Sequence, residues 1–368
     1  MHFILRFLYR TTVTIMVLLL IALVLVSIGL IRLSSPYKGY VEDSKLVDIP
    51  YGTRLVGIAD LLHREGIIRH PRTFVLAMAI ERRRGVIRAG EYEFNRPLSE
   101  MEVINKLLHG EVHFRQVTVP EGSNIFDIAD ILERDELTTR EEFLAATTHV
   151  ELVKDVAPNA VSLEGYLFPD TYKFEKHTTA LEIVERMVER FRHFLTPEYR
   201  QAAQEQNLTV SQAVILASLI EKETGQPDER PLVSAVFHNR LDDRQRLECD
   251  PTVIYAALVS NSFRGKIYRS DIQTDSPYNT YLQVGLPIGA ICNPGRASLD
   301  AAIRPAHVNY RYFVSDNNGH HIFSSTLEAH QNAVRAYRHA VSQGVALEPS
   351  HVPHAADPPG RSSPPKSR

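Results

Sequence analysis

The sequence feature that most constrains this chain is an uncharged run from Val13 to Ile31, which reads VTIMVLLLIALVLVSIGLI. As a helix this run would measure about 28 Å, close to the roughly 30 Å hydrocarbon core of a bilayer. Arg6 and Arg10 precede it without a nearby acid, which favours a cytoplasmic N-terminus. We therefore predict a cytoplasmic segment over residues 1–12 and a single-pass transmembrane helix over 13–33 in the cytoplasmic (inner) membrane. The remaining chain would be periplasmic or otherwise extracytoplasmic. A cleaved signal peptide is the alternative, although its apolar core is usually shorter.

The rest of the chain has a globular and mildly acidic composition. With 44% hydrophobic and 23% charged residues it can bury a core. The net charge of the whole chain is −3, and the part after the anchor is more acidic, which argues against a nucleic-acid partner. Cys249 and Cys292 are too few for a disulfide scaffold or a four-cysteine zinc site, and the sequence leaves open whether they pair. No H-E-x-x-H accompanies the histidines, so we predict neither a metal nor a cofactor.

Two similar segments, spaced by 70 residues, predict two small α/β units. PYGT at 50–53 and PEGS at 120–123 each follow a β-rich run and precede an amphipathic helix, with Thr53 or Ser123 expected as the N-cap. The similarity continues more loosely from AGEYEF at 89–94 to LEGYLF at 163–168. The first unit, over 44–112 after a linker at 34–43, resembles the LysM-like module of cell-wall proteins.

Beyond this unit the pattern predicts an α+β domain with a helical core and a small sheet. Helical spacing covers 181–194, 210–224 and 325–341, and strand-like pieces include TVIYAAL at 252–258, YRYFVSD at 310–316 and HHIFS at 320–324. The proline-rich segment 345–368 is predicted to be a disordered tail.

The most informative helix spans Thr209 to Gly225 and contains two acids, Glu221 and Glu223, in an almost wholly apolar sequence. Thr209 and Gln212 form a predicted capping box, and Gly225 a predicted C-cap. The face behind Glu221 consists of small residues, which would leave room for another molecule. A carboxyl group desolvated there would have a raised pKa and could act as a general acid. Periodicity does not choose between the two acids, and either could instead lie on a solvated last turn.

The resemblance that identifies a family rests on a series of ordered motifs. They are ILASLIEKET at 215–224, Glu229-Arg230, VSAVFHNRL at 233–241, DPTVIY at 250–255, LEGYLFPDTY at 163–172, SPYNTY at 276–281, GLPIGAI at 285–291 with Pro294-Gly295, and GHHIF at 319–323 with His330. Together they resemble the YceG-like endolytic murein transglycosylases over residues 116–344. The resemblance implies that Glu221, the first acid of the E-K-E-T string, is the catalytic acid. It also implies peptidoglycan strands as substrate and peptidoglycan synthases of the same membrane as partners.

The implied reaction breaks the β-1,4 bond between N-acetylmuramic acid and N-acetylglucosamine within nascent strands. The muramyl C6 hydroxyl replaces water and leaves a 1,6-anhydro end. One carboxyl group, that of Glu221, can act first as acid and then as base. The alternatives are a water-using muramidase, with Glu164, Asp170 or Asp250 as a second carboxylate, and an inactive cell-wall-binding scaffold.

Further residues are candidates for substrate binding. Glu164 and Asp170 flank aromatic residues, among them Tyr166, that could line a sugar groove or belong to the core. Tyr278, Asn279 and Tyr281 could hold N-acetyl groups or cap a strand. The remaining candidates are Glu223, Asp250, which could simply form a turn before Pro251, and His321.

Overall fold

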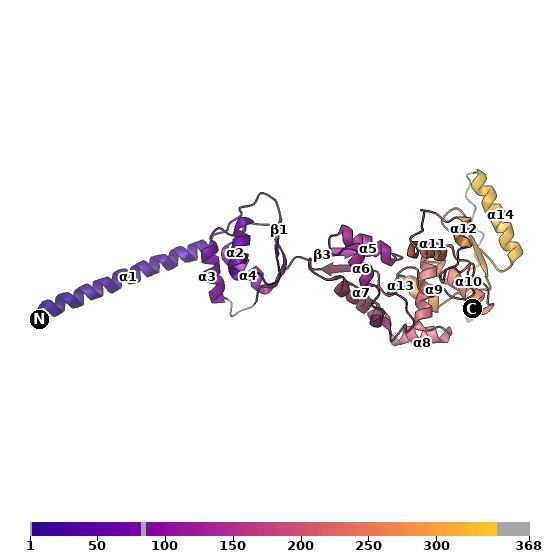
Figure 1. Ribbon diagram of the computed structural model, residues 1–368, viewed down its shortest axis with the longest axis horizontal. Coiled ribbons are helices and arrows are strands. Elements are labelled where there is room, and N and C mark those ends of the chain that lie inside the picture. Colours follow the sequence, from indigo (N-terminus) through magenta and orange to yellow (C-terminus); the bar gives the residue numbers. More distant parts are fainter. Residues whose placement is uncertain (1, 82–85, 344–368) are drawn as a thin grey trace, which may run out of the picture. The chain divides into compact units, whose positions relative to one another are not determined.

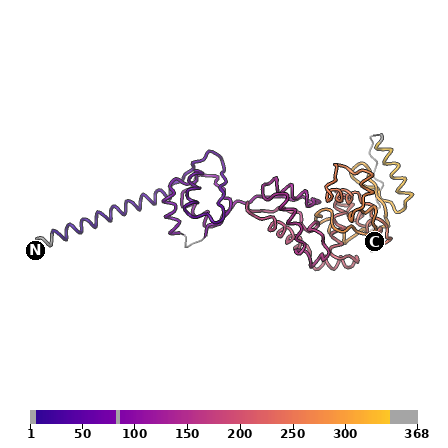
Figure 2. The backbone as a smooth tube through the Cα atoms, viewed as in Figure 1, coloured from indigo at the N-terminus to yellow at the C-terminus, as the bar shows by residue number. Residues whose placement is uncertain are grey.

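The computed structural model describes residues 2–81 and 86–343, so the predicted tail at 345–368 lies outside the described residues (Figure 2). The chain forms two compact units. Unit 1 contains residues 1–117 with 135–137 and 173–178, and unit 2 contains the intervening segments and everything from residue 179 onward. The predicted domain limits remain predictions.

The N-terminal element is one long helix, α1 (His2–Ser34) (Figure 1). The most apolar 18-residue window within Arg6–Ser34 has a mean hydropathy of 3.1, and none of that window is buried against the protein. The hydroxyl of Ser27 donates to the Leu23 carbonyl oxygen at 2.8 Å, so this polar group is satisfied within the helix itself. Length and composition thus permit a single membrane span, while its orientation remains a prediction.

The rest of unit 1 is a small α/β module. It contains β1 (Lys45–Ile49), α2 (Leu55–Arg64), α3 (Pro71–Glu81), β2 (Gly90–Phe94) and α4 (Glu100–His109). The two strands pair antiparallel, with Val47 opposite Tyr92, and Phe74 and Leu62 of the helices are fully buried with them. The predicted small α/β unit is therefore present, and its identity as a LysM-like module stays a prediction.

The same order of elements follows a second time. β3 (Arg115–Thr118) pairs with β4 (Thr171–Phe174), and the helices are α5 (Ile125–Arg134), α6 (Arg140–Ala146) and α7 (Ala180–Phe194), with the 3₁₀ helix η2 (Val150–Val153) before β4. The turn glycines Gly52 and Gly122 have nearly equal positive φ angles of 78° and 76°. The 70-residue repeat in the sequence is thus a structural repeat.

Two details of that repeat were predicted wrongly. The helices begin one residue later than expected, so Arg54 and Asn124 occupy the cap positions, and the Asn124 side chain accepts from the backbone N–H of Asp127 at 3.0 Å. The strand equivalent to β2 is β4, not 163–168, because the latter segment forms a buried turn around Gly165 at a φ of 91°.

The remaining elements of unit 2 surround one buried helix. They are α8 (Pro197–Glu205), α9 (Val210–Glu223), α10 (Arg230–Asp242), α11 (Asp250–Val259), α12 (Arg269–Ile272), α13 (Arg296–Ile303), β5 (Tyr312–Ser315), β6 (His321–Ser324) and α14 (Leu327–Gln343). Helices α8, α10, α11 and α13 all contact α9 (Figure 1). The α+β class with a helical core and small sheets is confirmed.

Segment 252–258 was predicted as a strand and lies instead inside α11. A short apolar run has no period that separates a strand from a buried helix, and Pro251 here occupies the first turn of a helix. In α9 the predicted capping box of Thr209 and Gln212 is confirmed. The predicted cap at Gly225 is wrong, because Thr224 already leaves the helix with an extended backbone.

Candidate active site

Glu221 lies on the last turn of α9 and its side chain is only 7% exposed. The backbone N–H of Gly295 donates to Glu221 Oε2 at 3.1 Å. On the other side, Arg230 Nη2 lies 3.9 Å from Glu221 Oε1. The carboxyl group therefore does not face bulk solvent, and it is held in place by one backbone donor and one nearby cation.

The turn between β3 and α5 packs against the same side chain. A Cβ atom placed on Gly122 would lie 3.4 Å from Glu221 Cγ. The neighbouring Lys222 Nζ donates to the Gly122 carbonyl oxygen at 3.3 Å, and the Gly122 N–H donates to the Asn293 carbonyl oxygen at 2.9 Å. Three segments that are far apart in the sequence thus meet at Glu221.

The small residues behind Glu221 do not leave an open space, contrary to the sequence-based prediction. The Ser218 hydroxyl oxygen accepts from the Ile291 N–H at 3.1 Å. A Cβ atom on Gly165 would lie 2.5 Å from the Cβ of Ala290 and 2.8 Å from Val214 Cγ1. Loops of the same chain therefore occupy the space beside the small side chains of α9. One of these loops places Gly295 next to Glu221.

Glu164 is buried at the centre of a network of hydrogen bonds, with 2% exposure. Its carboxyl group accepts from the Ile125 N–H, the Tyr255 hydroxyl and Asn293 Nδ2 at 2.8–2.9 Å. Burial raises the pKa of Glu164 to about 8, although the hydrogen bonds from the Ile125 N–H and the Tyr255 hydroxyl act against the rise. Because all three partners are internal, this structure presents Glu164 as a link between loops.

Glu223 lines a cavity of about 510 Å³ at the other side of the α9 terminus. Asp250 and Tyr281, both candidates from the sequence, line the same cavity, and the Tyr281 hydroxyl donates to Asp250 Oδ1 at 2.6 Å. Burial raises the pKa of Glu223, against the effect of a hydrogen bond from the Cys249 thiol. The structure thus brings three of the predicted substrate residues together.

The other candidates lie apart from this cavity. Tyr166 is buried, with its ring against Phe191 and its hydroxyl within 3.0 Å of the Ser211 hydroxyl. Asp170 accepts from Arg190 at 2.6 Å, and this hydrogen bond lowers the pKa of its carboxyl group. The aromatic segment around them is thus largely core.

Tyr278 and Asn279 are also enclosed. Tyr278 is 7% exposed and packs against the Tyr255 ring, with centroids 4.9 Å apart. Asn279 is 1% exposed, and its amide donates to the carbonyl oxygens of Ile272 and Thr274. The amide of Asn279 is thus already occupied by its own loop, and only a change of that loop would present it to a sugar.

His321 pairs with Glu229, an acid that sequence reasoning did not single out as a site residue. Glu229 is 4% exposed and accepts from His321 Nδ1 at 2.7 Å and from the Thr224 hydroxyl at 3.0 Å. Burial alone would raise the pKa of Glu229, but the hydrogen bonds from His321 and Thr224, together with the charge of His321, outweigh burial and lower it. The pair fixes the loop that follows α9.

Within the described residues no group of three or more His, Cys, Asp or Glu side chains could hold a metal ion.

The two cysteines are both buried and free. Cys249 contacts Glu223, whereas the Cys292 thiol donates to the Ser218 carbonyl oxygen at 3.4 Å.

The residue that sequence reasoning missed most clearly is Asn293, which joins Glu164 to two loops. The only signal for it was its place beside the Pro294-Gly295 motif.

Comparison with known proteins agrees with these motifs. A profile of the YceG-like family matches residues 47–336, so the chain belongs to that family. It is 31% identical over 315 residues to an endolytic murein transglycosylase of Bacillus subtilis, covering 80% of this chain and 86% of that protein. It is also 28% identical over 335 residues to an endolytic murein transglycosylase of Streptococcus pneumoniae, covering 83% of this chain but only 60% of the longer relative.

A solved structure shares the fold. The crystal structure of a YceG-like protein from Listeria monocytogenes has a TM-score of 0.54 and 29% sequence identity, and the match covers 79% of this chain and 99% of the other.

Proposed function

We propose that this protein is a membrane-anchored peptidoglycan lytic transglycosylase in which Glu221 is the catalytic acid. The murein transglycosylase activity is the one carried by the names of its curated relatives. The specific reaction is cleavage of the β-1,4 bond between N-acetylmuramic acid and N-acetylglucosamine within nascent strands, with formation of 1,6-anhydro ends.

The observation that carries the proposal is the position of the Glu221 carboxyl group. Its side chain is only 7% exposed, and it lies where three segments meet at the end of a buried helix. A shielded carboxyl group that is held by a backbone donor keeps a fixed direction, which a general acid needs in order to meet the leaving oxygen. Glu221 also heads the E-K-E-T string of the family resemblance.

The reaction needs one proton to move out and one to move back. Protonated Glu221 gives its proton to the glycosidic oxygen as the bond to muramyl C1 breaks. The muramyl C6 hydroxyl then attacks C1, and the Glu221 carboxylate accepts the hydroxyl proton, which restores the acid. The N–H of Gly295 and the cation of Arg230 stabilise the carboxylate that exists between these two steps.

The proposed setting is the outer face of the cytoplasmic membrane. With α1 as a single-pass anchor and the N-terminus inside, the catalytic unit reaches strands close to the membrane, which are the newly made ones. Peptidoglycan synthases in the same membrane are the proposed partners. Glu223, Asp250 and Tyr281 are the proposed substrate contacts, because they line one cavity and Glu223 lies on the same helical turn as Glu221.

The test is to replace each acid of α9 separately. Glu221→Gln keeps the size of the side chain and removes the acid, so we expect a loss of activity of about 10³-fold or more on sacculi. Glu223→Gln, the matched control on the same turn, should lose far less because Glu223 has no role in the proton transfers. Mass spectrometry of the products should find 1,6-anhydro ends. Reducing muramic ends would indicate a water-using muramidase, and full activity of Glu221→Gln would refute the assignment.

A further inference from the structure

A second acid, Glu121, lies beside the proposed catalytic group. Glu121 is the middle residue of the PEG turn between β3 and α5, directly before Gly122, which packs against Glu221. Its carboxyl group rests on Gly295, where an added Cβ atom would be 2.5 Å from Glu121 Oε2 and closer still to Oε1. Gly295 is the same residue whose N–H donates to Glu221 at 3.1 Å.

The backbone of Gly295 does not itself require glycine. Its φ of −73° and ψ of 170° are angles that any residue adopts. Any larger residue would nevertheless overlap with the Glu121 carboxyl group, and this overlap cannot be relieved without moving that group. A residue with a Cβ atom at position 295 would therefore displace the Glu121 carboxyl group from its present place.

The spacing of the two carboxyl groups follows from these contacts. Glu221 Oε2 lies 3.1 Å from Gly295 N, and a Cβ atom added to Gly295 would lie 2.5 Å from Glu121 Oε2. Covalent geometry fixes the distance from Gly295 N to that Cβ atom at about 2.5 Å, and the sum of the three distances is an upper limit on the separation of the two carboxyl oxygens. The two oxygens are thus at most about 8 Å apart. The two carboxyl groups of glycosidases are about 5–5.5 Å apart in retaining enzymes and about 6.5–9.5 Å apart in inverting ones, so this upper limit allows Glu121 and Glu221 to act on the same glycosidic bond.

Among the acids considered as a second carboxylate, Glu121 is the one whose carboxyl group is not engaged by other side chains that the structure describes. Glu164 is enclosed by three internal donors, Asp170 is paired with Arg190, and Asp250 accepts from Tyr281. Glu121 is exposed, and no hydrogen bond or ion pair joins its carboxyl group to another residue of the described chain.

We propose that Glu121 is a second catalytic residue, whose carboxylate stabilises the positive charge that develops on muramyl C1 as the glycosidic bond breaks. This inference rests on the proposed function of Glu221. Glu221 carries out both proton transfers, and Glu121 gains and loses no proton. Its contribution is electrostatic: a negative charge held on the same glycine as the acid faces the oxocarbenium-like transition state.

The experiment measures kcat, KM and products of the full-length enzyme in detergent on purified glycan strands. Glu121→Gln should lower kcat by about 10²-fold to 10³-fold while KM changes by less than about threefold, since the charge acts only in the transition state. The products should remain 1,6-anhydro. Sodium formate should partly restore the activity of Glu121→Ala by replacing the missing carboxylate. The exposed Glu185→Gln on α7 is the matched control and should be unchanged.

Gly295→Ala provides an independent variant, because its methyl group occupies the place of the Glu121 carboxyl group. It should lower kcat in the wild-type background and add little in Glu121→Ala, since both changes remove the same interaction. Full kcat in Glu121→Gln beside an inactive Glu221→Gln would overturn the inference and leave the proposed function intact. A lower melting temperature with unchanged kcat would assign Glu121 a purely structural role and also overturn it. An active Glu221→Gln would overturn the proposed function itself.

Discussion

Replacement of Asn293 by alanine is expected to destabilise unit 2 more than any other single hydrogen-bond deletion at the site. The side-chain oxygen of Asn293 accepts from the N–H groups of Gly165 and Leu167 at 2.9 Å each. Its amide donates to the Ser123 carbonyl oxygen at 3.0 Å and to Glu164 Oε1 at 2.8 Å. The residue is fully buried, so alanine would leave the N–H groups of Gly165 and Leu167 and Glu164 Oε1 without their partner, whereas the Ser123 carbonyl oxygen still accepts from the backbone N–H of residue 293.

The magnitude follows from the number of orphaned groups. Each buried group that loses its only partner costs about 1–3 kcal/mol, and a water molecule admitted to the space left behind would satisfy some of them. We therefore expect the free energy of unfolding to fall by about 3–5 kcal/mol, a large share of the roughly 5–15 kcal/mol typical of a folded protein. Activity should fall as well, because the Asn293 backbone holds the turn that packs on Glu221.

The assay is denaturation by guanidinium in detergent, followed by near-ultraviolet circular dichroism of the 15 tyrosines, since the chain has no tryptophan. Exposed Asn159→Ala in the same unit is the control. Asn293→Asp separates the two halves of the network, because it keeps the acceptor for Gly165 and Leu167 but turns an oxygen toward Glu164. A loss of less than about 1 kcal/mol for Asn293→Ala would refute the reasoning, since such a value is that of one ordinary hydrogen bond.

Two further predictions concern loops near the site. Gly165→Ala should destabilise by about 2–4 kcal/mol, because the backbone has a φ of 91° and the new Cβ would overlap Ala290; Gly225→Ala, with nothing within 4 Å, should be near neutral in the same denaturation experiment. Glu229→Gln should lose about 1.5–3 kcal/mol at neutral pH, because it removes the acceptor charge for His321. Since the pKa of Glu229 is lowered from 4.5 on folding, its contribution is present above pH 4.5 and is lost as pH falls through the folded value. The stability of the two proteins should therefore converge in acid, and a constant difference down to about pH 2 would contradict this.

Local sequence signals predicted the frame of the site well. Thr209 and Gln212 form the capping box of α9 because their reciprocal hydrogen bonds involve only residues three apart. The 70-residue repeat was visible for the same reason, since a proline, a turn glycine and an amphipathic helix are all short-range patterns. Such patterns were sufficient to place Glu221 near the end of a buried helix.

Contacts between residues far apart in the sequence could not be predicted from these local patterns. The small residues of α9 predicted a gap, but Ser218 and Val214 are covered by loops that lie far from α9 in the sequence. Asn293 and Glu164 are 129 residues apart in the sequence, and no local pattern states that they share a hydrogen bond. Periodicity reports which face of a helix is apolar, and it cannot report whether a ligand or the chain's own loop covers that face.

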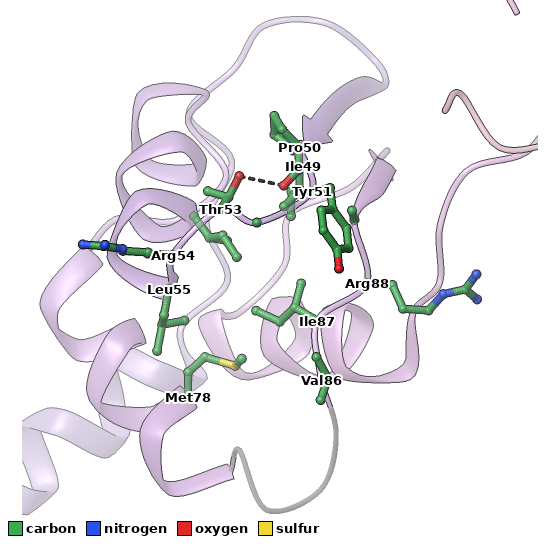
Figure 3. A pocket seen from close by; sticks show the side chains of 13 residues that line it. Ile49, Pro50, Tyr51, Thr53, Arg54, Leu55, Met78, Val86, Ile87 and Arg88 are labelled. Atoms are coloured by element: carbon green, nitrogen blue, oxygen red, sulfur yellow. Dashed lines mark hydrogen bonds between the residues drawn. The ribbon is translucent and has the colours of Figure 1, made fainter. Parts of the chain in front are cut away.

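The two copies of the proline–x–glycine turn separate what local sequence supplies from what packing adds. In unit 1 the turn carries Tyr51, which is 95% exposed, beside an open cavity of about 790 Å³, and the Thr53 hydroxyl donates to the Pro50 carbonyl oxygen (Figure 3). Nothing lies within 4 Å of a Cβ added to Gly52.

In unit 2 the same turn has almost the same glycine φ angle, yet Gly122 packs against Glu221 and carries Glu121 onto Gly295. Since the glycine conformation is the same in both turns, the difference lies in α9 and the loop before α13, which pack against the second copy. The middle residue of the turn should therefore tolerate substitution in unit 1, where it is Tyr51, and should not tolerate it in unit 2, where it is Glu121. Exchange of the two residues tests this directly: Tyr51→Glu should leave activity unchanged within about twofold, whereas Glu121→Tyr should abolish it, because a phenol ring cannot occupy the place of a carboxyl group against Gly295. Equal tolerance at both positions would show that the turn has no part in the site.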